Sequence, residues 1–308
     1  MLEGVVNVLK PPGMSSSDVV TDIRHIFNMK RVGHTGTLDP GAAGVLPICI
    51  GRATRLFDYL VDKEKEYIGE ITFGIATDTQ DSYGAPEGRS DAVVTGEMLM
   101  EALPKFTGHQ KQTAPLYSAL SVDGKKMYKL ARQGVEVERK VRDINVPELS
   151  FISQTGCNRY LVKIVCSKGT YVRTLCHDIG WSMGVPAHMS FLLRTRSGAF
   201  DLDGSFTIDE LKELKEKGEL YKAVIPMEQA LMHIGEARMT LNKKGERFLT
   251  HGAEVVCPGI EELPKDTPLR AYCNGKFLGI AKSNGEAVHI CTSVRKKNKK
   301  PSHSFRHL

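Results

Sequence analysis

Hydrophobic residues change their spacing several times along the first part of the chain. Val5, Val6, Val8 and Leu9 form an apolar run long enough for one strand, and a Lys-Pro-Pro-Gly turn stops it. Residues 67–74 alternate between apolar and polar side chains, which is the pattern of a strand with one buried face. Strands are therefore expected at both places.

Helical spacing begins after residues that can cap a helix. Behind a serine cluster and Asp18, apolar residues recur every three or four positions as far as Phe27. Residues 95–105 show the same period, and Thr207 with Glu210 forms a capping box for a further helix. The buried side of the 95–105 helix is expected to carry Met98, Leu99, Ala102 and Leu103.

One strand-to-helix junction carries an arginine in an unfavourable position. An apolar strand at residues 160–166 precedes a helix for which Thr170 is the expected N-cap and Gly184 the stop. Arg173 then lies in the first turn, where a cation opposes the helix dipole by roughly several tenths of a kcal/mol. This position favours an arginine that pairs with a carboxylate across a cleft over one that faces solvent.

The pattern becomes strand-rich after about residue 232. Residues 269–273 and 276–281 flank an Asn-Gly pair, the strongest short signal for a hairpin, and a second Asn-Gly pair follows at 284–285. A three-stranded meander in a small β domain is expected here. Because the rest of the chain mixes helices and strands, the expected fold class is α+β.

The length, cysteines and N-terminus narrow the class of protein. A length of 308 residues predicts about two domains, and 41% hydrophobic residues suffices for ordinary cores. None of the seven cysteines belongs to a Cys-x-x-Cys pair, and an odd count fits a reducing compartment. The N-terminal apolar run is too short for a signal sequence or a membrane span. We expect a cytoplasmic protein without a zinc-ribbon or redox motif.

The net charge of +6 is concentrated near the C-terminus. Residues 291–308 hold six bases and no acid, so the 42 bases and 36 acids of the chain leave residues 1–290 formally neutral. Attraction to a polyanion would come from this tail and from local patches. One such patch is residues 124–142, with seven bases against two acids. A charge run by itself more often indicates a solvated surface.

The best candidate for catalysis is a carboxylate on a glycine-flanked turn. Asp39 is followed by proline and glycine, an ordinary turn signal, and then by an apolar strand. The surrounding sequence, residues 33–56, reads GHTGTLDPGAAGVLPICIGRATRL. It resembles the catalytic loop of the bacterial tRNA pseudouridine synthases of the TruB family. The resemblance implies that Asp39 is the catalytic residue and that His34 fills the space left by the displaced uridine.

Three other segments are similar to motifs of that family. They are residues 7–13 (NVLKPPG), residues 65–70 (KEYIGE) and residues 167–175 (SKGTYVRTL). By pattern alone, Tyr67 is a core residue. The resemblance implies instead that Tyr67 stacks on the target base and assists proton removal, and that Arg173 bridges the catalytic aspartate.

The basic stretch at residues 124–142 coincides with the insertion that this family uses as a thumb against RNA. Residues 115–124 (PLYSALSVDG) lead into it. Phosphate contacts would require its charge. Lys10 by itself could equally be a surface lysine. The substrate-binding residues that the resemblance implies are His34, Lys10, Tyr171, Leu192, Arg132, Lys125, Lys126 and Lys129.

Other polar clusters are interpreted as structural. Asp78 and Asp81 are too few oxygen ligands for a calcium loop, and a turn is expected there. Cys176 and His177 have no second ligand pair and are expected to serve helix packing and polar contacts.

The resemblance also implies an architecture. It is a pseudouridine synthase fold, with a mixed, mainly antiparallel central sheet flanked by helices, and a small C-terminal β domain of PUA type. The expected division is a catalytic domain at 1–231 with the thumb-like insertion near 124–142, an RNA-binding domain at 232–294 and a basic tail at 295–308.

The implied activity is isomerisation of uridine-55 in the T loop of tRNAs to pseudouridine. It would proceed by base flipping and an Asp-dependent C-glycoside rearrangement, with no metal, cofactor or energy input. The resemblance further implies a monomer that binds the T arm without an obligate protein partner or a membrane. A T-arm-binding RNA chaperone and a guide-RNA-dependent pseudouridylase remain alternatives. An Asp-dependent glycoside hydrolase is disfavoured, because the sequence shows no second carboxylate for it.

Overall fold

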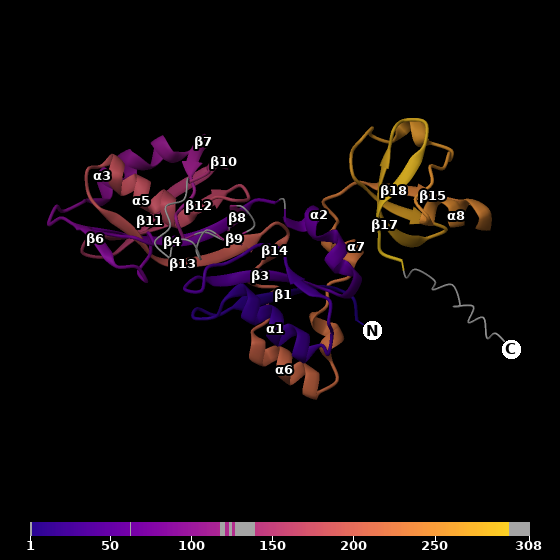
Figure 1. Cartoon of the computed structure of the whole chain (residues 1–308), viewed down its shortest axis with the longest axis horizontal. Coiled ribbons are helices and arrows are strands. Elements are labelled where there is room, and N and C mark those ends of the chain that lie inside the picture. The colour runs from indigo at the N-terminus through magenta and orange to yellow at the C-terminus, as the bar shows by residue number, and fades with distance from the viewer. Residues whose placement is uncertain (1, 62, 118–120, 123–124, 127–138, 296–308) are drawn as a thin grey trace.

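The computed structural model describes residues 2–61, 63–117, 121–122, 125–126 and 139–295. Within these ranges, an eight-stranded mixed sheet forms the centre of the larger domain (Figure 1). Its order is β1-β3-β13-β4-β12-β11, with β2 beside β3 and β14 beside β13. The strands are β1 (Gly4–Lys10), β2 (Val32–His34), β3 (Ala43–Ile50), β4 (Lys65–Phe73), β11 (Glu148–Gly156), β12 (Arg159–Cys166), β13 (Ala187–Ser197) and β14 (Phe200–Asp201).

Neighbouring strands of this sheet run antiparallel except at one place. There β13 pairs in parallel with β3. The expected mixed, mainly antiparallel α+β fold is therefore confirmed, and the parallel step joins the half of the sheet that contains β1 to the half that contains β4.

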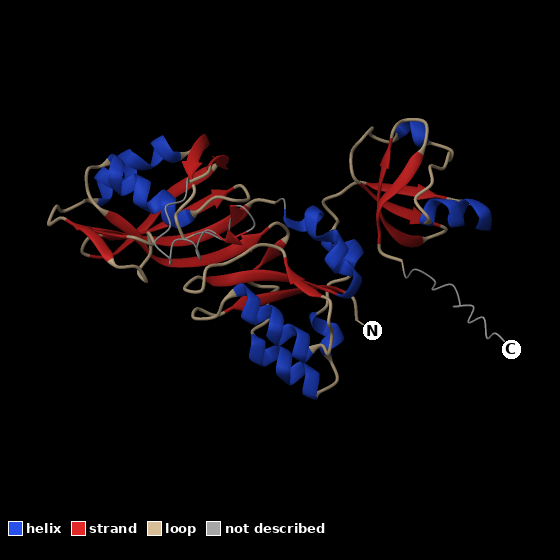
Figure 2. Cartoon of the chain, viewed as in Figure 1, coloured by secondary structure: helices blue, strands red, loops and turns tan. Residues whose placement is uncertain are grey.

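Helices cover the two halves of the sheet separately (Figure 2). Helix α1 (Ser16–Ile26) packs against α6 (Ile208–Glu216) beside β1, while α5 (Val172–Ser182) packs against β13 and α3 (Gly96–Ala102) against β11. The expected capping boxes are present, from Ser15 with Asp18 in α1 and from Thr207 with Glu210 in α6. None of the helices among the described residues is long and apolar enough to cross a membrane.

Shorter elements connect these layers. They are the 3-10 helices η1 (Gly51–Leu56), η2 (Leu103–Phe106) and η3 (Leu220–Ala223), the helices α2 (Phe57–Val61) and α7 (Met227–Ala230), and the strand pairs β5 (Ile75–Thr77) with β6 (Pro86–Arg89), β7 (Gly108–Thr113) with β10 (Val141–Val146) and β8 (Ser121–Val122) with β9 (Lys125–Lys126).

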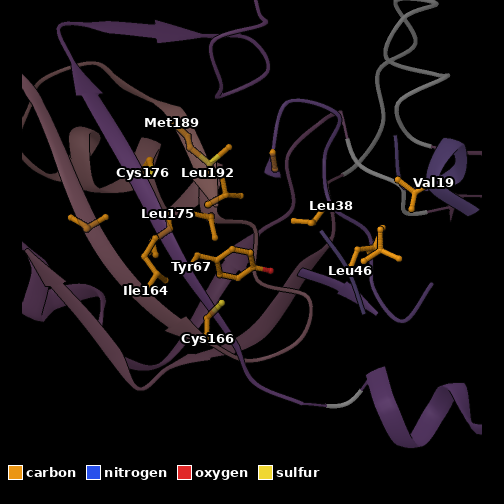
Figure 3. Close-up of a cluster of buried hydrophobic side chains, with 14 of the residues drawn as sticks. Val19, Leu38, Leu46, Tyr67, Ile164, Cys166, Leu175, Cys176, Met189 and Leu192 are labelled. Carbon is orange, nitrogen blue, oxygen red and sulfur yellow. The ribbon is translucent and has the colours of Figure 1, made fainter. Parts of the chain in front are cut away.

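The larger of two buried clusters in this domain extends to the region of Tyr67. The buried cluster includes residues of β1, α1, β3, β4, β12 and α5. Figure 3 shows Tyr67 in this cluster, its ring beside Ile164 and Cys166 and its oxygen directed towards the side where Leu38 lies. The expected alternation of β4 is confirmed, because every second residue of this strand is buried.

Sheet register brings three chain segments together at the parallel step. Arg194 of β13 lies opposite Tyr67 on one side and Gly44 of β3 on the other. At Gly44 a Cβ atom would lie 2.2 Å from the Arg194 carbonyl oxygen, and φ is +114°. Only glycine allows this close approach of β3 to β13. The loop that precedes β3 is thereby held against both strands.

The C-terminal domain contains the expected meander and one additional strand. Strands β16 (Leu269–Cys273), β17 (Lys276–Ser283) and β18 (Val288–Ser293) are antiparallel, and β15 (Glu236–Met239) pairs in parallel with β16 to complete a four-stranded sheet in the described chain. Helix α8 (Lys243–Thr250) and η4 (Ile260–Glu262) complete the domain. Its last strand is tied to the larger domain by Arg55, which donates to the Ser293 carbonyl at 2.8 Å, and by Tyr59, whose hydroxyl lies 3.2 Å from that of Thr292.

Two local expectations are wrong. Met98 is 42% exposed, because Leu99, Ala102 and Leu103 form the buried face and Met98 lies at the edge of that face. Thr170 is not the N-cap of α5. Tyr171 occupies that position without a side-chain cap, and the Thr170 hydroxyl instead donates to the Ser167 carbonyl.

Candidate active site

A cavity of about 240 Å³ opens where the loop before β3 meets β4, β13 and the start of α5. Five of its lining residues were predicted from the sequence as catalytic or substrate-binding. These are Asp39, Tyr67, Tyr171, Arg173 and Leu192. The structure therefore brings together residues that lie more than 150 positions apart in the sequence.

Asp39 sits on a loop that is fixed on both sides. The Ser16 hydroxyl, at the start of α1, accepts a hydrogen bond from the Leu38 N–H at 2.9 Å and donates one to the Leu38 carbonyl at 3.0 Å. After Asp39, the Ala42 N–H donates to the Asp39 carbonyl at 3.0 Å and closes a turn. The Asp39 side chain is 35% exposed, so it is held in place and still open to the cavity.

Arg173 is buried between two carboxylates. Its Nη1 atom lies 3.5 Å from Asp39 Oδ2 and 3.6 Å from Asp81 Oδ2, and its Nη2 atom donates to the Tyr117 carbonyl at 2.8 Å. The Arg173 guanidinium lies over the Tyr171 ring, with its central carbon 5.8 Å from the centre of the ring. The expected pairing of Arg173 with a carboxylate across a cleft is present, because α5 and the Asp39 loop face each other there.

Asp81 is a site residue that the sequence did not reveal. The expected turn is present. Within it, Asp81 Oδ1 accepts hydrogen bonds from the Thr79 hydroxyl at 2.6 Å and from the Tyr83 N–H at 3.0 Å. The other oxygen faces Arg173. A second carboxylate near Asp39 is therefore present after all. Arg173 contacts both carboxylates, so Asp81 supports the pairing of Arg173 with Asp39.

Arg194 is the second missed residue, and like Arg173 it lines the cavity. It is 1% exposed, and its charge opposes the rise that burial causes in the pKa of the nearby Tyr67 hydroxyl. Its Nε atom donates to the Val45 carbonyl at 2.7 Å, and its Nη atoms lie 3.3 Å from the Gly36 carbonyl and 3.5 Å from the Thr37 carbonyl. Arg194 therefore ties the backbone of the Asp39 loop to β13.

Tyr67 is a neutral phenol at neutral pH. Burial raises the pKa of its hydroxyl to about 12, and the charge of Arg194 acts in the opposite direction. The residue therefore belongs to the core, as its pattern indicated, and also to the cavity wall.

Lys10 requires a correction, because it cannot reach a substrate. Its side chain is fully buried, and Nζ donates to the carbonyls of Pro11 at 2.8 Å, Met14 at 2.6 Å and Pro40 at 3.2 Å. Burial lowers the pKa of the ammonium to about 8, while the nearby Asp39 raises it. Lys10 is thus neither a surface lysine nor a substrate contact. Its ammonium group binds the backbone carbonyl of Pro40, the residue next to Asp39.

The remaining expected binding residues differ in position. His34 is the last residue of β2, just before the Asp39 loop, and its Nδ1 atom accepts a hydrogen bond from the Gly36 N–H at 3.3 Å. Burial lowers the pKa of this imidazole. Only the backbone of Lys125 and Lys126 is described, in β9. Lys129 and Arg132, with most of the thumb-like insertion, and residues 296–308 of the tail lie outside the described residues.

The other candidate clusters have the structural roles expected of them. Asp78 accepts from the Ala85 N–H at 2.8 Å within its turn. Cys176 is buried in α5, and His177 stacks on Trp181. No group of three or more potential metal ligands occurs among the described residues.

Comparison with known proteins places the chain in a family. The model described as "TruB family pseudouridylate synthase (N terminal domain)" matches residues 24–172, and that of the "tRNA pseudouridylate synthase B C-terminal domain" matches residues 173–232. The chain belongs to the TruB family. The first match contains Asp39 and Tyr67, and the second begins at Arg173.

Relatives of this TruB-family chain extend over most of its length. It is 47% identical over 270 residues to tRNA pseudouridine synthase B of Pelotomaculum thermopropionicum, covering 86% of this chain and 85% of that one. It is 43% identical over 289 residues to tRNA pseudouridine synthase B of Caldanaerobacter subterraneus, covering 93% and 97%.

A solved structure supports the same fold. The match in a Cbf5-Nop10-Gar1 complex has a TM-score of 0.71 and 27% identity, and covers 95% of this chain and 85% of that one. The expected pseudouridine synthase fold is confirmed.

Proposed function

We propose that this TruB-family chain isomerises uridine-55 in the T loop of tRNAs to pseudouridine. The observation that carries the proposal is the carboxylate of Asp39, which lies in the cavity between Arg173 and the buried Tyr67. The relatives named tRNA pseudouridine synthase B, at 43–47% identity, support the same reaction and the same kind of substrate.

The reaction needs little beyond one carboxylate and a closed pocket. The N1–C1′ bond breaks, the base rotates, and C5 bonds to C1′; C5 then loses its proton and N1 gains one. A base inside folded RNA must flip out first, at a cost of about a few kcal/mol. Asp39 acts either as a nucleophile towards the nucleoside or as a base that removes a sugar proton.

Each cavity residue has a role that its geometry supports. Arg173 orients Asp39, and the second carboxylate, Asp81, also pairs with Arg173. Tyr67 and Leu192 form the apolar wall against which the flipped base lies. The Tyr67 hydroxyl assists removal of the C5 proton, and the charge of Arg194 opposes the rise that burial causes in the pKa of that hydroxyl.

RNA recognition would extend beyond the cavity. We assign catalysis to residues 1–231, phosphate contacts to the insertion at 124–142 and to the tail from 295, and a PUA-type RNA-binding role to residues 232–294. The four-stranded sheet in the last segment supports that assignment. The enzyme acts as a monomer in the cytoplasm and takes its site from the T arm itself, without a guide RNA or protein partner.

Tritium release tests the proposal. A T-arm hairpin with 5-tritiated uridine at the target position should lose tritium to water, and a hairpin with the label at another loop uridine should not. Hairpin binding without any release would leave a T-arm-binding chaperone. Release that requires an added guide RNA would indicate the guide-dependent alternative.

A further inference from the structure

A shallow groove adjoins the active-site cavity and is bordered by two exposed aromatic rings. The groove shares Asp39, Met189 and Leu192 with the cavity. Tyr83 and Phe191 line it, and their side chains are 75% and 43% exposed. Neither ring belongs to the buried core. Large apolar rings in this position leave surface that a ligand can cover.

Tyr83 is fixed in place although it is exposed. The Asp81 carboxylate accepts the Tyr83 N–H at 3.0 Å and so fixes the turn. The ring lies against Gly41 of the catalytic loop, where a Cβ atom would come within 2.1 Å of it. Only a residue without a side chain permits this contact. The ring of Tyr83 therefore forms a flat extension of the loop that carries Asp39.

Phe191 is directed to the same groove by an irregularity in β13. The register of β13 against β4 shifts between Met189 and Phe191, and such a bulge re-aims the side chain that follows it. The turn that carries Tyr83 is attached here, because the Met189 N–H donates to the Gln80 carbonyl at 3.0 Å and the Ser82 hydroxyl lies 3.4 Å from the Ser190 carbonyl, to which it donates. The two aromatic rings thus belong to one supported surface.

We propose that Tyr83 and Phe191 form a second base-binding subsite, on which a nucleobase next to the flipped uridine stacks. This inference rests on the proposed function, since the groove continues the cavity that would hold the target base. Aromatic side chains exposed beside a strand-binding site are the usual platform for unpaired bases, because every base has a flat apolar face. The groove contains Asp39, so its occupant has to be part of the same RNA strand as the target.

The test compares ring removal in the protein with base removal in the RNA. Tyr83→Ala and Phe191→Ala should each weaken binding of the T-arm hairpin about tenfold, while the single-turnover rate at saturating enzyme changes less than threefold. Tyr83→Phe, which keeps the ring, should bind like the wild type. Tyr221→Ala is the matched control, because Tyr221 is 60% exposed on η3, outside both the groove and the cavity.

Hairpins that lack one base, immediately 5′ or 3′ of the target, identify the stacked nucleotide. One of them should bind the wild type about tenfold more weakly and should lose nothing further with Tyr83→Ala, because the two changes remove the same contact. If Tyr83→Ala loses the same binding affinity on the intact hairpin and on both abasic hairpins, the proposed subsite is wrong. It is also wrong if both alanine variants bind like the wild type. Failure of the proposed function is separate: the wild type would then release no tritium from the intact hairpin.

Discussion

Two buried arginines face the same cavity, and they are held in opposite ways. Arg173, at the start of α5, lies between the carboxylates of Asp39 and Asp81. Arg194, in β13, hydrogen-bonds to three backbone carbonyls, and its charge opposes the rise that burial causes in the pKa of the Tyr67 hydroxyl. One guanidinium therefore acts on the group proposed to react. The other acts on the scaffold that positions it.

The difference matters because both charges reach beyond their hydrogen bonds. Burial lowers the pKa of His34, and the charge of Arg194 lowers it further. Burial likewise lowers the pKa of Lys10, where Asp39 raises it and Arg194 opposes Asp39. Arg194 thus discourages additional positive charge around the loop, while Arg173 compensates the negative charge at its tip. Substitutions that affect one arginine but not the other can separate catalysis from support.

The largest expected effect is at the carboxylate that Arg173 contacts. Asp39→Asn should abolish turnover while tRNA affinity stays within about tenfold, equivalent to about 1.4 kcal/mol, because phosphate contacts hold the substrate. Tritium release and filter binding measure the two quantities. Release by the variant above the background without enzyme would remove Asp39 from its catalytic role.

Replacing Arg173 should come next. Arg173→Met removes the cation that orients Asp39, and turnover should fall by about 100- to 1000-fold with a small change in the free energy of unfolding. Arg173→Lys is the control, because it keeps the charge but not the guanidinium geometry, and it should recover only part of the rate. Single-turnover rates and urea unfolding give both readouts. Loss of stability in proportion to activity would assign Arg173 to the scaffold instead.

Tyr67 lies opposite Arg194 in the sheet and lines the same cavity, so it tests what this side of the cavity contributes to chemistry. Tyr67→Phe keeps the ring and deletes the hydroxyl, and it should lower turnover about 100-fold with little change in binding. Tyr67→Leu removes both and should fail more completely. A Phe variant within threefold of the wild type in single-turnover assays would make Tyr67 a stacking platform only.

Arg194→Met should show the reverse balance from Arg173→Met. It leaves the carbonyls of Gly36, Thr37 and Val45 without their buried donor, so the free energy of unfolding should fall by about 2–4 kcal/mol. Turnover of the folded protein should fall only about tenfold. Urea unfolding monitored beside single-turnover rates at low temperature checks this. Unchanged stability would end the distinction between the two arginines.

The smallest effect is expected far from the cavity. Deleting residues 296–308 should reduce the salt dependence of tRNA binding and leave the rate on a T-arm hairpin almost unchanged. Arg295 is kept in this variant, because it pairs with Glu246 at 2.6 Å within the C-terminal domain. Binding constants at several salt concentrations provide the measurement, and equal losses on tRNA and hairpin would contradict the assignment of the tail.

Local sequence signals determined much of this protein. Capping boxes, the alternation of β4 and the Asn-Gly hairpins predicted elements that the structure contains, since each depends on residues close together in the chain. The glycine-rich loop and the segment around Arg173 also indicated the family and the pairing of Arg173 with a carboxylate. The Thr170 cap failed because helix ends depend on how the adjoining segment turns. Met98 failed because it lies at the edge of the buried face of α3.

The tertiary structure decided what these segments do to one another. Nothing near Arg194 in the sequence indicates that sheet register places it opposite Tyr67, nor that Asp81 shares Arg173 with Asp39. A lysine is normally a surface residue, but Lys10 is fully buried. Three carbonyls accept hydrogen bonds from its amine, and they come together only when the Asp39 loop packs against β1. Contacts between distant segments depend on strand pairing and packing across the whole domain, so residue type and local spacing cannot specify them.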